Sequence, residues 1–180
     1  MPMAVATVTS APQVTPTANA PTPAPGFQQL TDSQFGYAMT LPSAWHITQL
    51  NGALQGAPDS PRWSALIANV EIPSLQSLND NTDFVISIYR QPMTSENDLL
   101  LTIADRMIAQ PGDILRRTQG ATVEYYAAKM LPDSFGRPTQ ARWFWNGRET
   151  LSVTVLVLNP STTQMTQIDQ ALDSVQLLNP

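Results

Sequence analysis

The dipeptide Asn146-Gly147 is the feature that most constrains the fold, because it lies between two long runs of alternating residues. Asn-Gly is strongly preferred in two-residue type I′ turns, which join adjacent antiparallel strands. The run 142–145 precedes the dipeptide, and the run 148–158 follows it. The sequence therefore predicts a β-hairpin with long strands, in which Trp145 lies opposite Arg148.

Strand alternation gives this hairpin two faces of different chemistry. One face carries Phe144, Leu151, Val153, Val155 and Val157, and the other carries Trp143, Trp145, Arg148, Thr150, Ser152 and Thr154. Aromatic residues and arginine dominate recognition surfaces, and Trp145 beside Arg148 would form a cation–π pair. Trp143, Trp145 and Arg148 are therefore a candidate binding face. The alternative is that a helix covers both tryptophans.

A period of two predicts further strands, and a period of 3.6 predicts two helices. The expected strands lie at 35–41, 63–72, 83–90, 114–117, 122–131 and 140–145, with another extended piece starting at Trp45. The first helix follows Ser95 as its N-cap and stops at Pro111-Gly112. The second follows Ser161 or Thr162, with its apolar stripe on Met165, Ile168, Leu172 and Val175.

This order of elements (strands, one helix, strands, one helix) predicts an α+β fold. We expect an antiparallel β-sheet with helices packed on its faces, formed by a single domain over residues 27–180. A domain of about 150 residues buries close to 70% of its unfolded surface, so it needs no disulfide or metal for stability. The chain contains no cysteine, which excludes thiolate zinc sites and cysteine nucleophiles.

The segment Phe35-Gly36-Tyr37-Ala38-Met39-Thr40-Leu41-Pro42-Ser43-Ala44-Trp45 resembles the opening of PsbP-like domains. In those domains an aromatic and a small residue precede a hydrophobic strand and Pro-x-x-Trp. The final hairpin and helix, ending in Leu172-Asp173-Ser174-Val175, are similar to the end of the same domains. The resemblance implies a PsbP-like α/β/α sandwich of the bacterial lipoprotein branch. Because members of this superfamily mostly bind or assemble other proteins, it carries over no catalytic residue.

Residues 1–26 contain no charged and no aromatic side chain and are rich in Pro, Thr and Ala. Such a segment buries too little surface to offset its chain entropy, so we expect a disordered, extended leader. We expect it to tether the domain to a membrane anchor. That anchor would be a signal segment or a lipidated cysteine that precedes Met1 in the gene and is missing from this sequence. The domain would then lie outside the cytoplasm and contact the membrane only through that anchor. The alternatives are an ordinary tail and a cytoplasmic protein.

No residue pattern indicates catalysis, a metal or a cofactor. His46 is the only histidine, so it cannot form a multi-histidine site, and we interpret it as a structural or surface residue. Asp80, Asn81 and Asp83 lack the glycine and distal glutamate of a calcium loop, and such clusters usually form turns. The net charge of −5 argues against nucleic acid as a partner.

The sequence therefore predicts a non-catalytic binding or assembly domain. We expect its partner to be a protein and the chain itself to be a monomer. Arginines cluster in and beside the later strands, whereas residues 71–105 are mostly acidic. One interpretation is a polarised molecule that binds an acidic partner, and the other is that these charges are only solvated. The alternatives are a cytoplasmic chaperone or adaptor, and a small-ligand protein or enzyme with a pocket near Trp63, Trp143 and Trp145.

Overall fold

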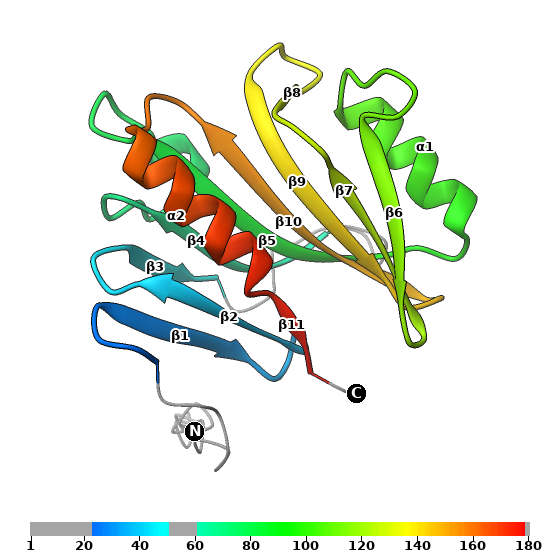
Figure 1. Ribbon diagram of the computed structural model, residues 1–180, viewed down its shortest axis with the longest axis horizontal. Coiled ribbons are helices and arrows are strands. Elements are labelled where there is room, and N and C mark those ends of the chain that lie inside the picture. Colours follow the sequence, from blue (N-terminus) through cyan, green and yellow to red (C-terminus); the bar gives the residue numbers. More distant parts are fainter. Residues whose placement is uncertain (1–22, 51–60, 179–180) are drawn as a thin grey trace, which may run out of the picture.

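The computed structural model describes residues 23–50 and 61–178. Residues 1–22 of the predicted leader, residues 51–60 and the last two residues of the predicted domain lie outside these ranges. Figure 1 shows the arrangement of the described elements. None of the helices in the described ranges is long and apolar enough to cross a membrane.

Most strands form one eight-stranded sheet in which every neighbouring pair is antiparallel. Its path is β3-β4-β5-β10-β9-β7-β6, and β8 pairs with β9. The bounds are β3 His46–Gln49, β4 Arg62–Ala68, β5 Phe84–Pro92, β6 Ile114–Gln119, β7 Thr122–Ala127, β8 Leu131–Pro132, β9 Pro138–Trp145 and β10 Glu149–Val157.

A second sheet of three strands has the order β1-β2-β11, with β1 at Phe27–Asp32, β2 at Tyr37–Pro42 and β11 at Gln176–Leu177. Helix α2, Thr162–Asp173, lies beside this sheet, and α1, Glu96–Arg106, lies at the opposite end of the molecule next to β6 (Figure 1). Sequence reasoning did not anticipate β1 or β11. The expected fold class, an antiparallel α+β fold with two helices, is confirmed.

Both helices begin where the sequence predicts. The side chain of Ser95 accepts a hydrogen bond from the amide of Asp98, and Ser161 forms a capping box with Gln164. The predicted end of α1 at Pro111-Gly112 is wrong. The helix stops at Arg106, because Met107 adopts an extended conformation and bridges to Asp133.

Two predicted strands are too long. The strand expected at 63–72 ends at Ala68, and the strand expected at 122–131 divides into β7 and β8. The Asn146-Gly147 hairpin forms, but its loop is shifted by one residue, to Gly147 and Arg148. The side-chain oxygen of Asn146 accepts hydrogen bonds from the amides of Arg148 and Glu149, both at 3.0 Å.

The shifted loop changes the pairing of the two strands but not their faces. Trp145 lies opposite Thr150, so the predicted pairing of Trp145 with Arg148 is wrong. Because the pairing has slipped by an even number of residues, the side chains within the two strands keep their predicted faces. Arg148 is the exception, because it lies in the loop and belongs to neither strand. Phe144 packs in the main core with Leu151 and Val153, and Trp143 packs in a different cluster.

The two faces of the large sheet are covered differently. The closed face packs against the three-stranded sheet and α2, forming a core that includes Phe84, Ile86, Ile88, Val153, Val155, Tyr37, Met39, Ile168 and Leu172. The open face is covered in two separate places. Helix α1 and Met107 cover the β7–β9 end, whereas Ile72 and Leu78 pack on Leu66 and Val85 of β4 and β5.

Candidate functional site

A groove of about 270 Å³ lies on the open face, between these two covered regions. Its floor is formed by the central strands and includes Tyr89 of β5, Trp143 of β9 and Thr154 of β10. One wall holds Leu75 of the short 3-10 helix η1, Leu75–Ser77, and the other follows the end of α1. The groove is mainly apolar, with a few polar groups among its lining residues.

Three side chains form a continuous row along this groove. The ring centroids of Trp63 and Tyr89 lie 5.0 Å apart, and the guanidinium carbon of Arg106 lies 5.3 Å from the centroid of the Tyr89 ring. Arg106 also donates a hydrogen bond to the hydroxyl of Tyr89 and another, 3.3 Å long, to the Oε1 atom of Gln91. The row therefore places a fixed positive charge at one end of an aromatic surface.

The turn after β8 forms the second wall. Asp133 accepts hydrogen bonds from the amides of Phe135 and Arg137, and its carboxylate pairs with the Arg137 guanidinium at 2.7 Å. Burial disfavours the charged carboxylate, but these hydrogen bonds outweigh burial and hold the pKa of Asp133 below its usual range. The turn holds Phe135 with 81% of its surface exposed, at the edge of the groove.

The structure separates the three residues of the predicted binding face. Trp143 is only 2% exposed because it packs beneath α1 against Leu99 and Ile103, and its remaining surface lines the groove. The indole nitrogen of half-buried Trp145 donates to the carbonyl of Met93 at 3.0 Å. Arg148 is exposed in the hairpin loop, at a different cleft. Helix α1 thus covers Trp143, which was the alternative interpretation of this face.

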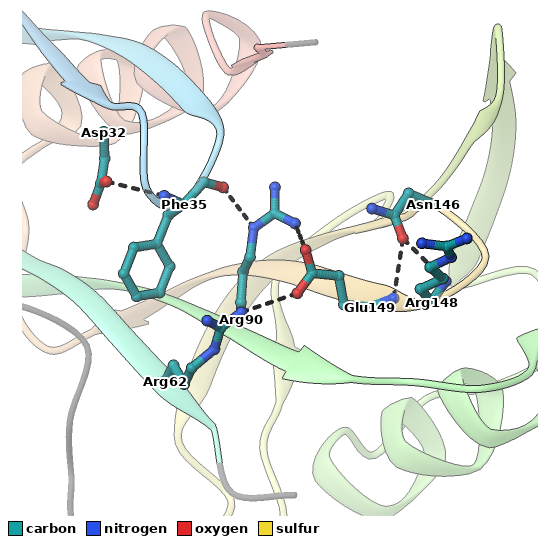
Figure 2. A network of polar contacts seen from close by, with 7 residues as sticks. All are labelled: Asp32, Phe35, Arg62, Arg90, Asn146, Arg148 and Glu149. Atoms are coloured by element: carbon teal, nitrogen blue, oxygen red, sulfur yellow. Dashed lines mark hydrogen bonds and ion pairs between the residues drawn. The ribbon is translucent and has the colours of Figure 1, made fainter. Parts of the chain in front are cut away.

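That second cleft is wide and shallow, about 1210 Å³ in volume, and lies where the turns of three hairpins meet β11. Figure 2 shows its charged side chains. Arg90 donates to the carbonyl of Phe35 at 2.5 Å and pairs with Glu149, which also pairs with Arg62 at 3.1 Å. The guanidinium groups of Arg90 and Arg62 thus share the single carboxylate of Glu149. They join the β1–β2 turn to the large sheet, so we interpret this network as structural.

A second polar chain connects the two sheets inside the protein. Ser64 is an extra residue in β4, where the register with β5 shifts between Trp63 and Ala65. Its hydroxyl lies 2.8 Å from the hydroxyl of Tyr37 and donates to Asp32 at 2.5 Å. Burial, with a smaller contribution from the charge of Asp32, raises the pKa of Tyr37 above its ordinary value. Since Ser64 is 2% exposed, no substrate reaches its hydroxyl.

The remaining titratable residues do not form a chemical site within the described ranges. His46 is exposed on β3, at the edge of the large sheet. The side chain of Asp83, just before β5, accepts hydrogen bonds from the side chains of Asn69 and Gln164, and Gln164 connects it to α2. The side chain of Asn79 accepts a hydrogen bond from the amide of Asn81, so the Asn/Asp cluster forms a turn. No three His, Cys, Asp or Glu side chains of residues 23–50 and 61–178 could hold one metal ion.

Sequence reasoning found part of this groove and missed the rest. One alternative placed a pocket near Trp63, Trp143 and Trp145; Trp63 and Trp143 line the groove, and Trp145 does not. Arg106 and Phe135 were not identified, although an exposed aromatic residue in the short segment Asp133-Ser134-Phe135-Gly136-Arg137 was a usable signal. The position of Arg106 depends on where α1 ends, which the sequence did not reveal.

Comparison with known proteins supports the fold. No protein-family model matches the sequence, and no curated protein matches it. Among solved structures, the solution structure of cyanobacterial PsbP (CyanoP) from Synechocystis sp. PCC 6803 is similar, with 12% sequence identity and a TM-score of 0.53. The match covers 89% of this chain and 97% of that one.

A crystal structure of a protein from Bacteroides thetaiotaomicron VPI-5482 also aligns, with 11% identity and a TM-score of 0.40. That alignment covers 80% of this chain and 46% of the other. The match to the Synechocystis protein, in contrast, spans most of both chains. The fold of this chain is therefore PsbP-like.

Proposed function

We propose that this chain is a non-catalytic binding domain that holds a segment of a partner protein in the open-face groove. The observation that carries the proposal is Phe135, a large aromatic side chain that is 81% exposed at the edge of a groove containing Trp63 and Tyr89. Aromatic residues beside an apolar groove are typical of the centre of a protein interface. A PsbP-like fold fits this role but does not determine it.

The size of the groove favours a peptide segment over a small ligand. Its volume of about 270 Å³ lies just below the range for ligand pockets, which is roughly 300–1,000 Å³. It holds one or two side chains of a longer segment whose remaining atoms lie outside.

Affinity capture from the native organism tests this proposal. We expect the wild-type chain to retain one partner, and Phe135→Ala to reduce its recovery at least roughly tenfold, as for a central interface residue. The control is Leu101→Ala, because Leu101 is 62% exposed on α1 and does not line the groove. Equal recovery by the wild type and folded Phe135→Ala would contradict the proposal.

We further propose that the leader tethers this domain outside the cytoplasm. The uncharged, proline-rich composition of residues 1–26 supports a spacer that holds a domain away from a surface. Fractionation of native cells, combined with metabolic labelling by an alkyne fatty acid, measures both location and lipid anchoring. Recovery of the protein in the cytoplasmic fraction without label would favour a cytoplasmic chaperone or adaptor instead.

A further inference from the structure

We propose that the groove selects an acidic segment, in which a carboxylate pairs with Arg106 while a neighbouring apolar side chain packs against Trp63 and Leu75. This inference rests on the proposed function and specifies the chemistry of the partner. It follows from the charge of Arg106, from the way its guanidinium is held, and from the apolar surface beside it.

Arg106 carries a charge without a counter-charge among the described residues. All nine basic residues lie in the described ranges, and seven of them pair with a carboxylate within 4.0 Å. The two exceptions are Arg106 and Arg148. Arg148 is exposed in a hairpin loop, where water solvates it, whereas Arg106 is half-buried in the groove. A half-buried guanidinium gains more from a carboxylate partner than an exposed one does.

The contacts of Arg106 orient it for such a partner. Its two hydrogen-bond acceptors, the Tyr89 hydroxyl and Gln91 Oε1, are neutral. A guanidinium has five N–H donors, so further donors are available to a ligand. The two hydrogen bonds and the contact with the Tyr89 ring, 5.3 Å from its centroid, hold the guanidinium in place, which reduces the entropy lost when a carboxylate binds.

The other charges of the groove do not oppose an acidic ligand. Asp133 is the only carboxylate among the lining residues of the groove, and its charge is matched by Arg137. The lining charges therefore sum to one positive charge, that of Arg106. Beyond Tyr89 in the same groove, Trp63 and Leu75 offer an apolar surface to the neighbouring side chain of the ligand. Acidic and neutral segments would make the same apolar contact with this surface. Only an acidic segment would also pair with the charge of Arg106, so the groove would favour it.

A matched pair of short peptides tests the inference with the full chain. The probes are acetyl-Leu-Asp-Leu-amide and acetyl-Leu-Asn-Leu-amide, which have the same shape and differ in one charge. Nuclear magnetic resonance of the indole N–H groups reports the binding site, because the chain has four tryptophans. Trp63 and Trp143 line the groove, whereas Trp45 and Trp145 do not and serve as internal controls. We expect shifts at Trp63 and Trp143 alone, with the aspartate peptide binding roughly tenfold more tightly.

The variant Arg106→Gln should remove this preference while leaving the asparagine peptide bound as before. Unchanged binding of the neutral peptide also shows that the groove of the variant is intact. The matched control is Arg116→Gln, because Arg116 is an exposed arginine that pairs with Glu96 away from the groove. We expect this control to keep the tenfold preference.

Three results would overturn the inference. Equal binding of the two peptides is the first, and an unchanged preference in Arg106→Gln is the second. The third is acetyl-leucine binding as tightly as the aspartate peptide, which would indicate a small carboxylate ligand instead of a protein segment. If the inference fails while Phe135→Ala still loses its partner in affinity capture, the proposed function stands and only the acidic chemistry is wrong.

Discussion

The two faces of the large sheet are built from the same strands and differ in almost every property. On β5, the closed face receives Phe84, Ile86 and Ile88, and the open face receives Val85, Ser87 and Tyr89. On β10, Val153 and Val155 alternate with the polar residues Ser152 and Thr154 in the same way. The closed face is covered by a second sheet and a helix, whereas a groove interrupts the cover of the open face.

This contrast separates two tasks. A continuous apolar face covered on all sides stabilises the fold, because each buried side chain contributes through the area it removes from water. An interrupted cover leaves apolar and aromatic surface where a partner can bind. The predictions below test whether the closed face carries stability and the open face carries binding.

The largest expected difference is between a phenylalanine of each face. Phe84 is 0% exposed and packs against Trp45 at 4.6 Å between ring centroids. We expect Phe84→Ala to lower the free energy of unfolding by about 3–5 kcal/mol, the usual cost of a cavity of that size. Phe135→Ala should change it by less than about 0.5 kcal/mol. Urea denaturation measures both, and similar losses in the two variants would contradict the separation of tasks.

The next prediction concerns the turn that joins the small sheet to the large one. Gly36 has φ of +66°, and a Cβ atom there would lie 2.9 Å from a guanidinium nitrogen of Arg90. We expect Gly36→Ala to destabilise the fold by more than the roughly 1–2 kcal/mol of backbone strain, because Arg90 must also shift. Gly120 has φ of +59°, and a Cβ atom there would meet no other atom within 4 Å, so Gly120→Ala measures the backbone strain alone. Equal losses would show that the contact with Arg90 is unimportant.

Alkaline pH should weaken the closed side through Tyr37. Burial raises the pKa of Tyr37 above that of the unfolded chain, which is about 10. Above pH 10 the unfolded state therefore loses this proton while the folded state keeps it, so stability falls as pH rises, by up to about 1.4 kcal/mol per pH unit. Stability below pH 10 is unaffected by this group. Denaturation between pH 9 and 11.5 should show a shallower decline for Tyr37→Phe than for the wild type.

The smallest effect is expected inside the cover of the open face. The hydroxyl of Thr150 is buried with no hydrogen-bond partner among the described residues, whereas that of Thr139 donates to the carbonyl of Arg137 at 3.1 Å. Thr150→Val should therefore stabilise the protein by about 0.5–1 kcal/mol, and Thr139→Val should destabilise it by a similar amount. Thermal unfolding distinguishes the two, and a loss of stability in Thr150→Val would reveal a partner for its hydroxyl.

The alternation along the hairpin was sufficient to assign its residues to the two faces. Apolar Val153 and Val155 and polar Ser152 and Thr154 take their predicted sides, even though the turn lies one residue further on. A shift of the pairing by two residues preserves every face, so the prediction of faces was robust to an error in the turn. The resemblance to the first strand of PsbP-like domains likewise came from residues 35–45. The positive φ of Gly36 explains why a small residue is needed before that strand.

The groove could not be predicted to the same extent, because its walls depend on long-range contacts. Helix α1 ends at Arg106 since Met107 bridges to Asp133, a residue of a distant turn. The extra residue Ser64 in β4 breaks the simple alternation beside Trp63. Neither feature leaves a periodic pattern, and both decide which side chains face the groove. The tryptophans were therefore found by residue type, and Arg106 and Phe135 were missed.

Photocrosslinking in native cells tests the central claim, that the partner binds the open face and not the closed side. The photoreactive amino acid p-benzoylphenylalanine would replace Phe135 or Leu75 at the groove, or Gln170, which is exposed on α2. The account predicts one shared crosslinked protein from positions 135 and 75 and none from 170. A crosslink to that protein from 170 alone would place the interface on the opposite side and contradict the account.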